Sequence, residues 1–335
     1  MEDRGMRTRR AYVDLIWNGA AVSGKMSGYQ KDVTYTDPAS GEADSIDVSI
    51  HDRGGTWIGP WFPETGDTLA ATIKAMDWAG PGDTRILPCG SFVLDNFNFS
   101  GWPIAGTISG VSVPADSSFR ETERSKTWEN VTVEEIGKEI AGRAGVSLSY
   151  DVEGGPIQIK TIEQSERTDC DFYMELCSTY GLAMKVYSKK IVVFDREAYK
   201  AKGPSATITP DMIQSWNWDR KLAGTYTGGE YTYTDPGTEE EIKVNVGEGP
   251  RILKVSGKAD NKADAERKIK AAVANANHGA SKMSVTIMGT ASLVASQCVA
   301  MVGLGKLSGK YYIDQITHHI GGSGYTMDLD LSLVE

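Results

Sequence analysis

Few stretches of this sequence combine residue types that could bind a cofactor, and the first is Gly303–Gly309, which reads GLGKLSG. Glycine beside lysine is typical of phosphate-binding loops, in which backbone amides and the lysine surround the phosphates. Such a loop also needs a glycine five residues before the Gly-Lys pair and a serine or threonine after the lysine. Ala300 and Leu307 occupy these positions. We therefore predict a turn between strands and no bound cofactor.

The adjacent His318 and His319 raise the question of a metal site, because imidazole is a common metal ligand. The surrounding residues alternate as in a strand, in which neighbouring side chains point to opposite faces. Two such rings would not reach one ion. We expect one buried and one exposed histidine, and no metal.

No motif indicates a catalytic residue. A serine nucleophile of the hydrolase type requires G-x-S-x-G, but Gly106–Gly110 reads GTISG, with the serine one place late. Acidic residues are abundant, yet without a motif no pair of them indicates a glycosidase. Five acids cluster on expected hairpins: Asp44, Asp47, Glu239, Glu240 and Glu241. They favour a solvated face that protects strand edges, with a negative surface selected for a purpose as the alternative.

Composition bounds the class of protein. The 335 residues suffice for two or three domains, and the glycine and tyrosine content favours a β-rich fold. A net charge of −10 and a pI near 5.1 argue against a protein that binds nucleic acid by neutralising phosphates. One basic cluster lies in residues 1–10, which we expect to be a flexible solubilising tail: Arg4, Arg7, Arg9 and Arg10.

The cysteines and the hydropathy indicate the compartment. Four cysteines are scattered without a C-x-x-C pair, which predicts neither a zinc site nor a disulfide framework: Cys89, Cys170, Cys177 and Cys298. No apolar run approaches the roughly 18 residues that a membrane span needs, and no signal peptide is evident. We expect a chain that is cytosolic in its producing cell, in a reducing compartment, and that does not leave that cell by the general secretory route.

Residues 11–114 are expected to form a small β-barrel or sandwich, with the barrel preferred. Apolar residues alternate with polar ones in Asp44–Ile50, DSIDVSI, as in a strand with one buried face. Turn signals such as Asp37-Pro38 and Gly66-Asp67 separate several such runs. Many short strands need closure or a second sheet to hide their edges.

Residues 115–204 have a different character and are expected to be an inserted α+β domain. Thr132 and Glu135 form a capping box at the start of one helix, and Gly145 marks its end. A second helix is expected from about Asp169 to Gly181, followed by a hairpin with its turn at Lys189-Lys190.

Residues 205–335 return to a β pattern that resembles the first region. The stretch TYTDP occurs at Thr34–Pro38 and again at Thr232–Pro236, in each case before an acidic segment and an alternating strand. Downstream, Gly90–Asp95 reads GSFVLD and Gly309–Asp314 reads GKYYID, so both fit G-x-aromatic-x-aliphatic-D. We predict an internal duplication that gives two similar β-barrels, the second with a helix added over residues 261–279.

Taken in order, these parts resemble the phage late control gene D family. The resemblance covers nearly the whole chain and is carried by DSIDVSI, by the F-P-x-x-G-D of Phe62–Asp67, by a loosely spaced Q, D, F, E-L series in Gln164–Leu176, and by G-K-Y-Y-I-D-x-I-x-H from Gly309. Members of this family are baseplate hub proteins of contractile phage tails and tail-like particles, related to the N-terminal part of type VI secretion spike proteins.

The resemblance implies a mainly β fold with an α+β insert, in which two tube-like β-barrel domains flank a small α+β domain. It implies a homotrimer whose six similar barrels form a pseudo-sixfold ring between a hexameric tail tube and a trimeric spike. The expected partners are the chain itself, the tube protein, the spike and other baseplate proteins. DNA would pass an acidic channel without specific binding, in a particle assembled in the bacterial cytoplasm.

Two other functions remain open at this point. The insert carries aromatic residues that would suit a cell-wall-binding module: Trp128, Tyr150, Phe172, Tyr173, Tyr180 and Tyr187. We expect most of them in the core. A peptidoglycan hydrolase is the second alternative, without a supporting motif. The chain ends at Glu335 after the last expected strand, so the spike is expected to be a separate protein.

Overall fold

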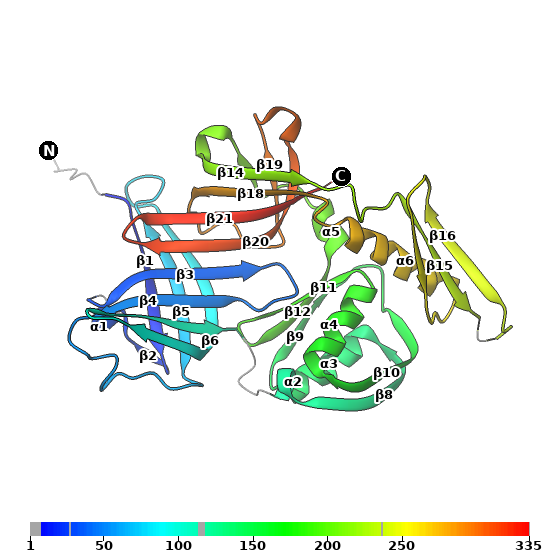
Figure 1. Cartoon of the computed structure of the whole chain (residues 1–335), viewed down its shortest axis with the longest axis horizontal. Helices are drawn as coiled ribbons and strands as arrows, with labels where there is room; N and C mark the ends of the chain where they lie inside the picture. Colours follow the sequence, from blue (N-terminus) through cyan, green and yellow to red (C-terminus); the bar gives the residue numbers. More distant parts are fainter. Residues whose placement is uncertain (1–7, 27, 113–117, 236, 335) are drawn as a thin grey trace.

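The computed structural model describes residues 8–26, 28–112, 118–235 and 237–334. Its first region, here called the first β unit, has a core of apolar strand residues around Leu15, Ile73 and Ile108. In chain order its elements are β1 (Arg10–Trp17), β2 (Ala20–Ala21), α1 (Ser23–Met26), β3 (Gln30–Pro38), β4 (Ser45–Asp52), β5 (Thr68–Met76), β6 (Thr84–Ser100) and β7 (Ile104–Val111) (Figure 1). Of the expected flexible tail, residues 1–7 with Arg4 and Arg7 lie outside the described residues, and so does the expected boundary at 114/115.

The insert unit follows and has its own core. Its elements are α2 (Ser118–Glu121), β8 (Glu123–Thr132), α3 (Val133–Arg143), β9 (Ser147–Asp151), β10 (Gln158–Thr168), α4 (Asp169–Thr179), β11 (Leu182–Tyr187), β12 (Lys190–Asp195) and α5 (Arg196–Ala201). The capping box is present, because Thr132 Oγ1 accepts from the Glu135 amide at 3.1 Å and Glu135 returns a bond to the Thr132 amide. The hairpin turns at Ser188-Lys189, one residue earlier than expected.

The Q-to-D part of the family pattern forms a buried polar cluster in this unit. Gln164 donates to Asp169 Oδ1 at 2.9 Å, and Arg143 binds both oxygens of the same carboxylate, at 2.8 and 3.0 Å. Asp169 is the first residue of α4, where a carboxylate also interacts well with the helix dipole. The cluster therefore holds α3, α4 and β10 together.

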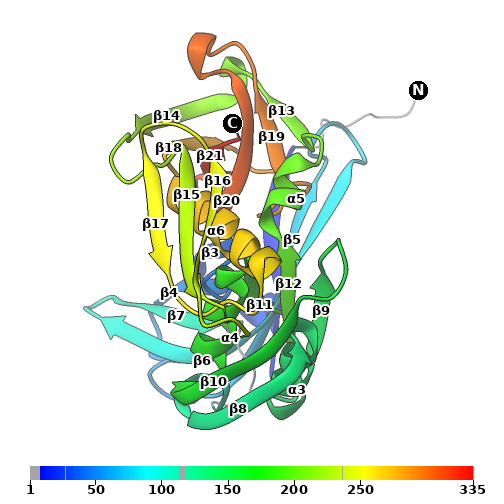
Figure 2. The same cartoon turned by 90° about the vertical axis from the view of Figure 1, so that its right-hand side faces the viewer.

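The last region contains two different parts. Its elements are β13 (Ala206–Ile208), η1 (Pro210–Met212), β14 (Ile213–Arg220), β15 (Gly228–Thr234), β16 (Glu241–Gly247), β17 (Ile252–Ser256), α6 (Lys262–Asn277), β18 (Ser281–Met288), β19 (Cys298–Met301), η2 (Gly305–Leu307), β20 (Gly309–Gly321) and β21 (Gly324–Leu333). Strands β15, β16 and β17 form a separate sheet covered by α6, here called the side unit (Figure 2). The remaining strands form the second β unit.

The two β units share one sheet of 13 strands, with the main order β14-β18-β21-β20-β3-β4-β7-β6-β5-β1-β2. The mainly β class predicted from the sequence is thus confirmed. The expected closed barrels are not seen among the described residues, because β20 serves both units. Its first part pairs with β19, and after Asp314 it pairs with β3, from Gln315 opposite Pro38 to Gly321 opposite Asp32.

The two units have the same strand order. In the first unit neighbouring strands are β3-β4-β7-β6-β5-β1, and in the second they are β14-β18-β21-β20-β19-β13. One pair differs in direction, since β1 is antiparallel to β5 whereas β13 is parallel to β19. The correspondence of five successive pairings supports the duplication inferred from G-x-aromatic-x-aliphatic-D.

Two β-bulges occur at matching places in the units. Pairing of β6 with β7 shifts between Leu94 and Asn96, and pairing of β20 with β21 shifts between Ile313 and Gln315. The extra residues are Asp95 and Asp314, the last residue of the shared motif. A second shift lies between Gln30 and Asp32 in β3 and between Ile213 and Ser215 in β14. Because a bulge fixes register and bend, these matches define which residues correspond.

The prediction that the two TYTDP stretches occupy equivalent positions in the two β units is wrong. The first copy forms the end of β3 in the long sheet, whereas Thr232–Thr234 of the second copy lie in β15 of the side unit, and Pro236 lies outside the described residues. The strand that corresponds to β3 is β14. The extra length of the second region is accordingly the whole side unit, β15 to α6, and not a helix alone.

A buried ion cluster joins the units. Lys185 of β11 lies 2.5 Å from Asp37 and 3.0 Å from Asp44, and Asp37 also accepts from the Ala295 amide of the second β unit at 2.8 Å. Tyr35 donates to Asp44 at 2.7 Å. Burial raises the pKa of Asp44 to about 6, with Lys185 acting in the opposite direction. The solvated position expected for Asp44 is therefore wrong, because its cationic partner comes from the insert.

Candidate functional site: the polar face of the long sheet

Strand alternation gives the long sheet two chemically different faces. One faces the hydrophobic cores, and the other, here called the polar face, consists of half-exposed or exposed small polar and acidic residues. From β14 to β6 they are Ser215, Asn217, Asp219, Lys282, Ser284, Thr286, Thr326, Asp328, Asp330, Gln315, Thr317, His319, Asp32, Thr34, Thr36, Ser45, Asp47, Ser49, Thr107, Ser109, Asn96, Asn98 and Ser100.

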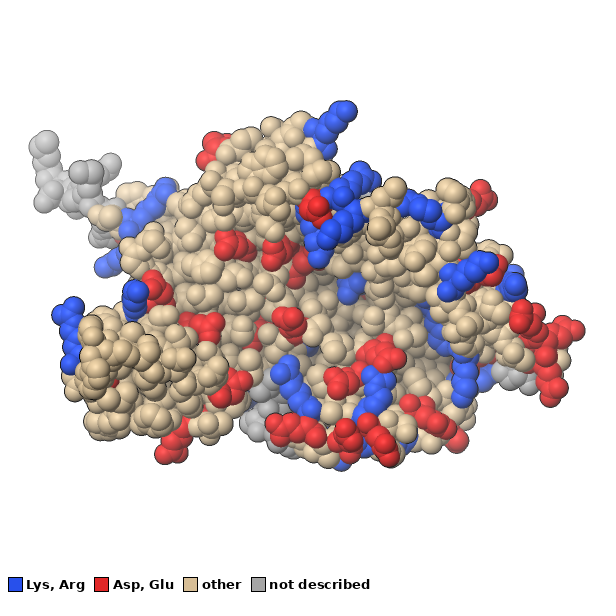
Figure 3. Space-filling model, in the orientation of Figure 1, with Lys and Arg blue, Asp and Glu red and all other residues tan. Residues whose placement is uncertain are grey.

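The polar face is negative. It carries five aspartates against one lysine, with His319 as a further titratable group. Figure 3 looks onto this side of the sheet and shows acidic patches along its middle. The aspartates come from both β units, on β3, β4, β14 and β21. A negative field over such a surface repels phosphates and other anions.

Hydrogen bonds from neighbouring strands hold these carboxylates in place. Asp330 accepts from Ser284 at 2.7 Å, Asp328 from Thr286 at 2.6 Å, and Asp47 from Ser109 at 2.5 Å. The last pair repeats the first at the corresponding position of the other β unit, since Asp47 corresponds to Ser284 and Ser109 to Asp330. Acceptor and donor have exchanged strands, but the cross-strand bond is retained.

The two neighbouring histidines separate as predicted. His318 is fully buried, bonds Tyr325 Oη through Nδ1 at 2.9 Å and stacks on Tyr35 with ring centroids 5.6 Å apart. Burial lowers the pKa of His318 to about 4. His319 lies on the polar face, with Nε2 3.0 Å from Asp328 Oδ2. The described residues contain no group of histidine, cysteine and carboxylate side chains suited to a metal ion.

The five acids that cluster in the sequence do not form one surface. Asp44 is buried at the ion cluster and Asp47 lies on the polar face. Glu239, Glu240 and Glu241 are exposed at the turn between β15 and β16, in the side unit at the far end of the molecule (Figure 1). The polar face was not predicted from the sequence, although the polar residues that alternate in DSIDVSI indicated one solvent-facing side of a strand. Combining such sides into one surface requires knowledge of the strand order.

The stretches considered above for cofactor binding or catalysis lie in a connection between strands and within a strand. Gly303–Gly309 connects β19 to β20, with η2 inside it, and Gly106–Gly110 lies within β7. Asp67 of the F-P-x-x-G-D pattern accepts from the indole of Trp17 and the amide of Asn18, at 3.0 and 2.7 Å, and so closes one end of the first β unit. The cysteines that the structure describes are all free.

Most aromatic residues of the insert belong to its core, and one of them, Tyr180, also borders a cleft beside α6. Four of the six are buried in its core: Trp128, Phe172, Tyr173 and Tyr180. Tyr150 and Tyr187 are half-buried, and Tyr187 donates to the Pro88 carbonyl of the first β unit at 3.0 Å. The core position expected for most of them is confirmed, and the main cue for a wall-binding module is lost.

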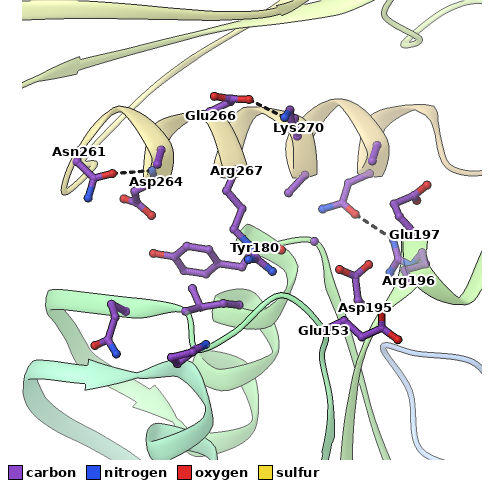
Figure 4. Close-up of a pocket in the computed structure, with 18 residues that line it drawn as sticks. Glu153, Tyr180, Asp195, Arg196, Glu197, Asn261, Asp264, Glu266, Arg267 and Lys270 are labelled. Atoms are coloured by element: carbon purple, nitrogen blue, oxygen red, sulfur yellow. Dashed lines mark hydrogen bonds and ion pairs between the residues drawn. The ribbon is translucent and has the colours of Figure 1, made fainter.

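A cleft of about 700 Å³ lies between the insert and α6 (Figure 4). Two of the charged residues that line it, Glu266 and Lys270, form an ion pair at 2.6 Å. Arg196 donates to Asn275 at 2.9 Å, and Asn275 donates to the Ser178 carbonyl at 3.0 Å, so α6 is fixed to the insert across the cleft. These contacts across the cleft are typical of a junction between two packed units. Among the described residues, no helix is long and apolar enough to cross a membrane.

Comparisons with known proteins agree with the resemblance stated from the sequence. A family model described as YQBQ-like matches residues 252–332. The chain is 24% identical to a probable baseplate hub protein of Escherichia phage 186, over 99% of this chain and 95% of that protein. It is 25% identical to a probable baseplate hub protein of Escherichia phage P2, over 95% of this chain and 92% of that one.

Solved structures share the fold. A tail protein from Neisseria meningitidis MC58 superposes with a TM-score of 0.72 at 13% identity, over 96% of each chain. A component of the type VI secretion system of E. coli superposes with a TM-score of 0.58 at 11% identity, over 99% of this chain and 76% of that chain. The chain is thus similar to probable baseplate hub proteins of two phages and shares its fold with these tail and type VI secretion proteins.

Proposed function

We propose that this chain is the structural hub of the baseplate of a contractile phage tail or tail-like particle, and that three copies form a ring between the tail tube and the spike. The observation that carries the proposal is the presence of two β units with the same strand order and bulges in one chain. The names of the two phage relatives support the hub role.

Symmetry explains why a hub would need two like units. A ring of three chains offers threefold symmetry to a trimeric spike, and its six similar units offer near-sixfold symmetry to a hexameric tube. The insert unit and the side unit occur once per chain, so each would occur three times around the ring. The 1–10, 11–114, 115–204 and 205–335 boundaries belong to this proposal as approximate domain limits.

The polar face would line the channel of that ring. Serine, threonine and asparagine offer no charge to a phosphate, and the aspartates repel it, so DNA would slide past without specific binding. The chain would have a structural role without a cofactor or catalytic step. Its partners would be further copies of itself, the tube and spike proteins and other baseplate proteins, assembled in the cytoplasm of the bacterial host.

The mass of the purified protein in solution, measured by light scattering and followed by negative-stain imaging, tests this proposal. We expect a particle of three times the 36.3 kDa chain mass, with six lobes around an open centre. A compact monomer at every concentration would contradict the ring. Retention of the full chain on purified cell wall, or clearing of a wall zymogram, would instead favour a wall-binding module or a hydrolase.

A further inference from the structure

The cleft between the insert unit and α6 is large enough to hold a ligand. Its volume of about 700 Å³ lies within the roughly 300–1,000 Å³ of typical ligand pockets. Figure 4 shows its two walls, with α6 of the side unit on one side and parts of the insert unit on the other. The insert wall consists of Tyr180 and Gly181 after α4, the residues around the start of β10, and the first residues of α5.

The two walls are anchored to each other at both ends of α6. In its last turn, Asn275 accepts from Arg196 at 2.9 Å and donates to the Ser178 carbonyl at 3.0 Å. Just before its first turn, Asp260 accepts from the Lys160 amide at 2.8 Å. These contacts fix the separation of the walls, so the cavity between them is already formed before a ligand enters.

Most charged residues that line the cleft have a side-chain partner. Glu266 pairs with Lys270, Glu197 with Lys200 and Asp264 with Lys268, and Arg196 binds Asn275. Three others bind no side chain among the described residues: Arg267, Asp195 and Glu153. Their charges are therefore available to a ligand.

These three residues come from opposite walls. Arg267 extends from the middle of α6 towards the insert, and within the described residues only its Nε has a partner, the Tyr180 carbonyl at 3.5 Å. Asp195 lies on the insert wall, where Oδ1 accepts from the Ala198 amide at 3.1 Å and caps α5. Glu153 lies on the same wall. One cavity thus has a cation on one side and two carboxylates on the other.

These charges select a ligand that carries both signs. A guanidinium with two free amino groups binds a carboxylate through two parallel hydrogen bonds, and carboxylates bind an ammonium group. Arg267 and Asp195 are half-buried, so salt screens such contacts less than at an open surface. Ala271 and Ala274 follow Arg267 on the same face of α6, and their short side chains leave room for a peptide backbone.

We propose that this cleft binds a short peptide with free ends, whose terminal carboxylate contacts Arg267 and whose terminal ammonium group contacts Asp195 and Glu153. The site goes beyond the structural role proposed above. It does not require the ring, because the insert unit and the side unit of one chain supply both walls.

Saturation-transfer NMR on the full chain tests the ligand class. Alanine, dialanine and trialanine serve as probes, because each residue lengthens the ligand by about 3.5 Å. The tightest of them is then compared with its C-amidated and N-acetylated forms, each of which lacks one charged end. We expect either block to weaken binding at least about tenfold, through loss of a charge-assisted hydrogen bond. A block that leaves the affinity unchanged overturns the proposal, as does a failure of every probe to bind at about 10 mM.

Variants test the assigned side chains. Arg267→Gln should weaken binding of the free peptide at least about tenfold without weakening the amidated peptide further. Asp195→Asn combined with Glu153→Gln should do the same for the acetylated peptide, and asparagine retains the cap of α5. Lys262→Gln is the matched control, because it removes a cation from the first turn of the same helix outside the cleft.

The control variant should bind the free peptide as the unmodified chain does, and circular dichroism verifies that all variants fold. Equal effects of Arg267→Gln and Lys262→Gln would contradict the assigned site. Light scattering on the same samples reports the ring separately. A trimer that binds no peptide contradicts this site alone, whereas a monomer that binds the free peptide contradicts the ring alone.

Discussion

Lys185 Nζ lies 2.5 Å from Asp37 Oδ1, so a lysine of the insert and an aspartate at the end of β3 form an ion pair from which most solvent is excluded. Asp44 and the Pro38 carbonyl complete the surroundings of this ammonium group, at 3.0 and 3.1 Å. Because Asp37 also binds the Ala295 amide, one cluster holds the insert and both β units in a fixed relation.

Replacing Lys185 with methionine should destabilise the protein by about 3–5 kcal/mol near neutral pH, because two buried carboxylates lose their cation. The loss should become smaller below about pH 6, where Asp44 takes up a proton. Urea unfolding at pH 7.5 and at pH 5 measures both effects. Lys190→Met, at an exposed position of β12, is the matched control and should change stability by less than about 0.5 kcal/mol. Equal effects of the two variants would argue against the buried cluster.

His318 should make the protein sensitive to acid. Burial lowers its pKa from 6.5 to about 4, so its contribution is complete above pH 6.5 and is lost as the pH falls towards 4. The shift corresponds to about 3 kcal/mol at most. Asp44, with a raised pKa, acts in the opposite direction in the same range. Stability curves of the unmodified chain and of His318→Gln should therefore be subtracted, which removes the part due to Asp44. A difference that does not vary from pH 7 to pH 4 would show that His318 is not responsible.

Two glycines of α3 should respond oppositely to alanine. A methyl group at Gly137 would overlap the hydroxyl of Tyr173, which donates to the Val133 carbonyl at 3.1 Å. We expect Gly137→Ala to destabilise by about 1–3 kcal/mol, since the buried ring has little room to move. Gly142 has no atom near the added methyl group, so Gly142→Ala should stabilise by about 0.5–1 kcal/mol through helix propensity. Thermal unfolding of both variants decides, and stabilisation by both would mean that Tyr173 is not packed on this helix.

The location of the negative charge should matter more than its amount. Changing Asp47, Asp328 and Asp330 to lysine gives the polar face a positive field, whereas changing Glu239, Glu240 and Glu241 to lysine alters net charge equally in the side unit. We expect the first triple variant to bind a short DNA duplex at least tenfold more tightly at low salt, with binding lost as salt rises. Fluorescence anisotropy measures this, after circular dichroism has verified that both variants fold. Equal binding would contradict a channel role for the polar face.

Local signals in the sequence predicted local structure well. The Thr132 capping box gave the start of α3 correctly, and the alternation in DSIDVSI gave β4. The motif that ends at Asp95 and Asp314 was informative because it marks a β-bulge, in which one extra residue on one strand shifts the register and bends the strand. The TYTDP repeat marks no such feature. It fits a half-buried strand that ends in a turn, so its second copy lies in β15, a strand that does not correspond to β3.

Non-local pairing could not be predicted in the same way. Asp44 was expected in solvent because its partner, Lys185, is distant in sequence and belongs to a different unit. β20 could close a barrel within its own unit or pair with β3 of the other unit. Which of the two pairings forms depends on the partner strands as much as on β20 itself. The polar face depends on the pairing with β3, since its eight strands form one surface only when they are joined in one sheet.

The β20–β3 ladder also determines how the chain would respond to a protease. The two β units are joined covalently through the insert but are held side by side by a backbone ladder and a common core. A cut in the exposed turn at Gly154-Gly155 would break the covalent route and leave the ladder intact. The nicked fragments should therefore migrate together on a sizing column and come apart only in denaturant. One broken peptide bond in this turn would then leave the two β units assembled.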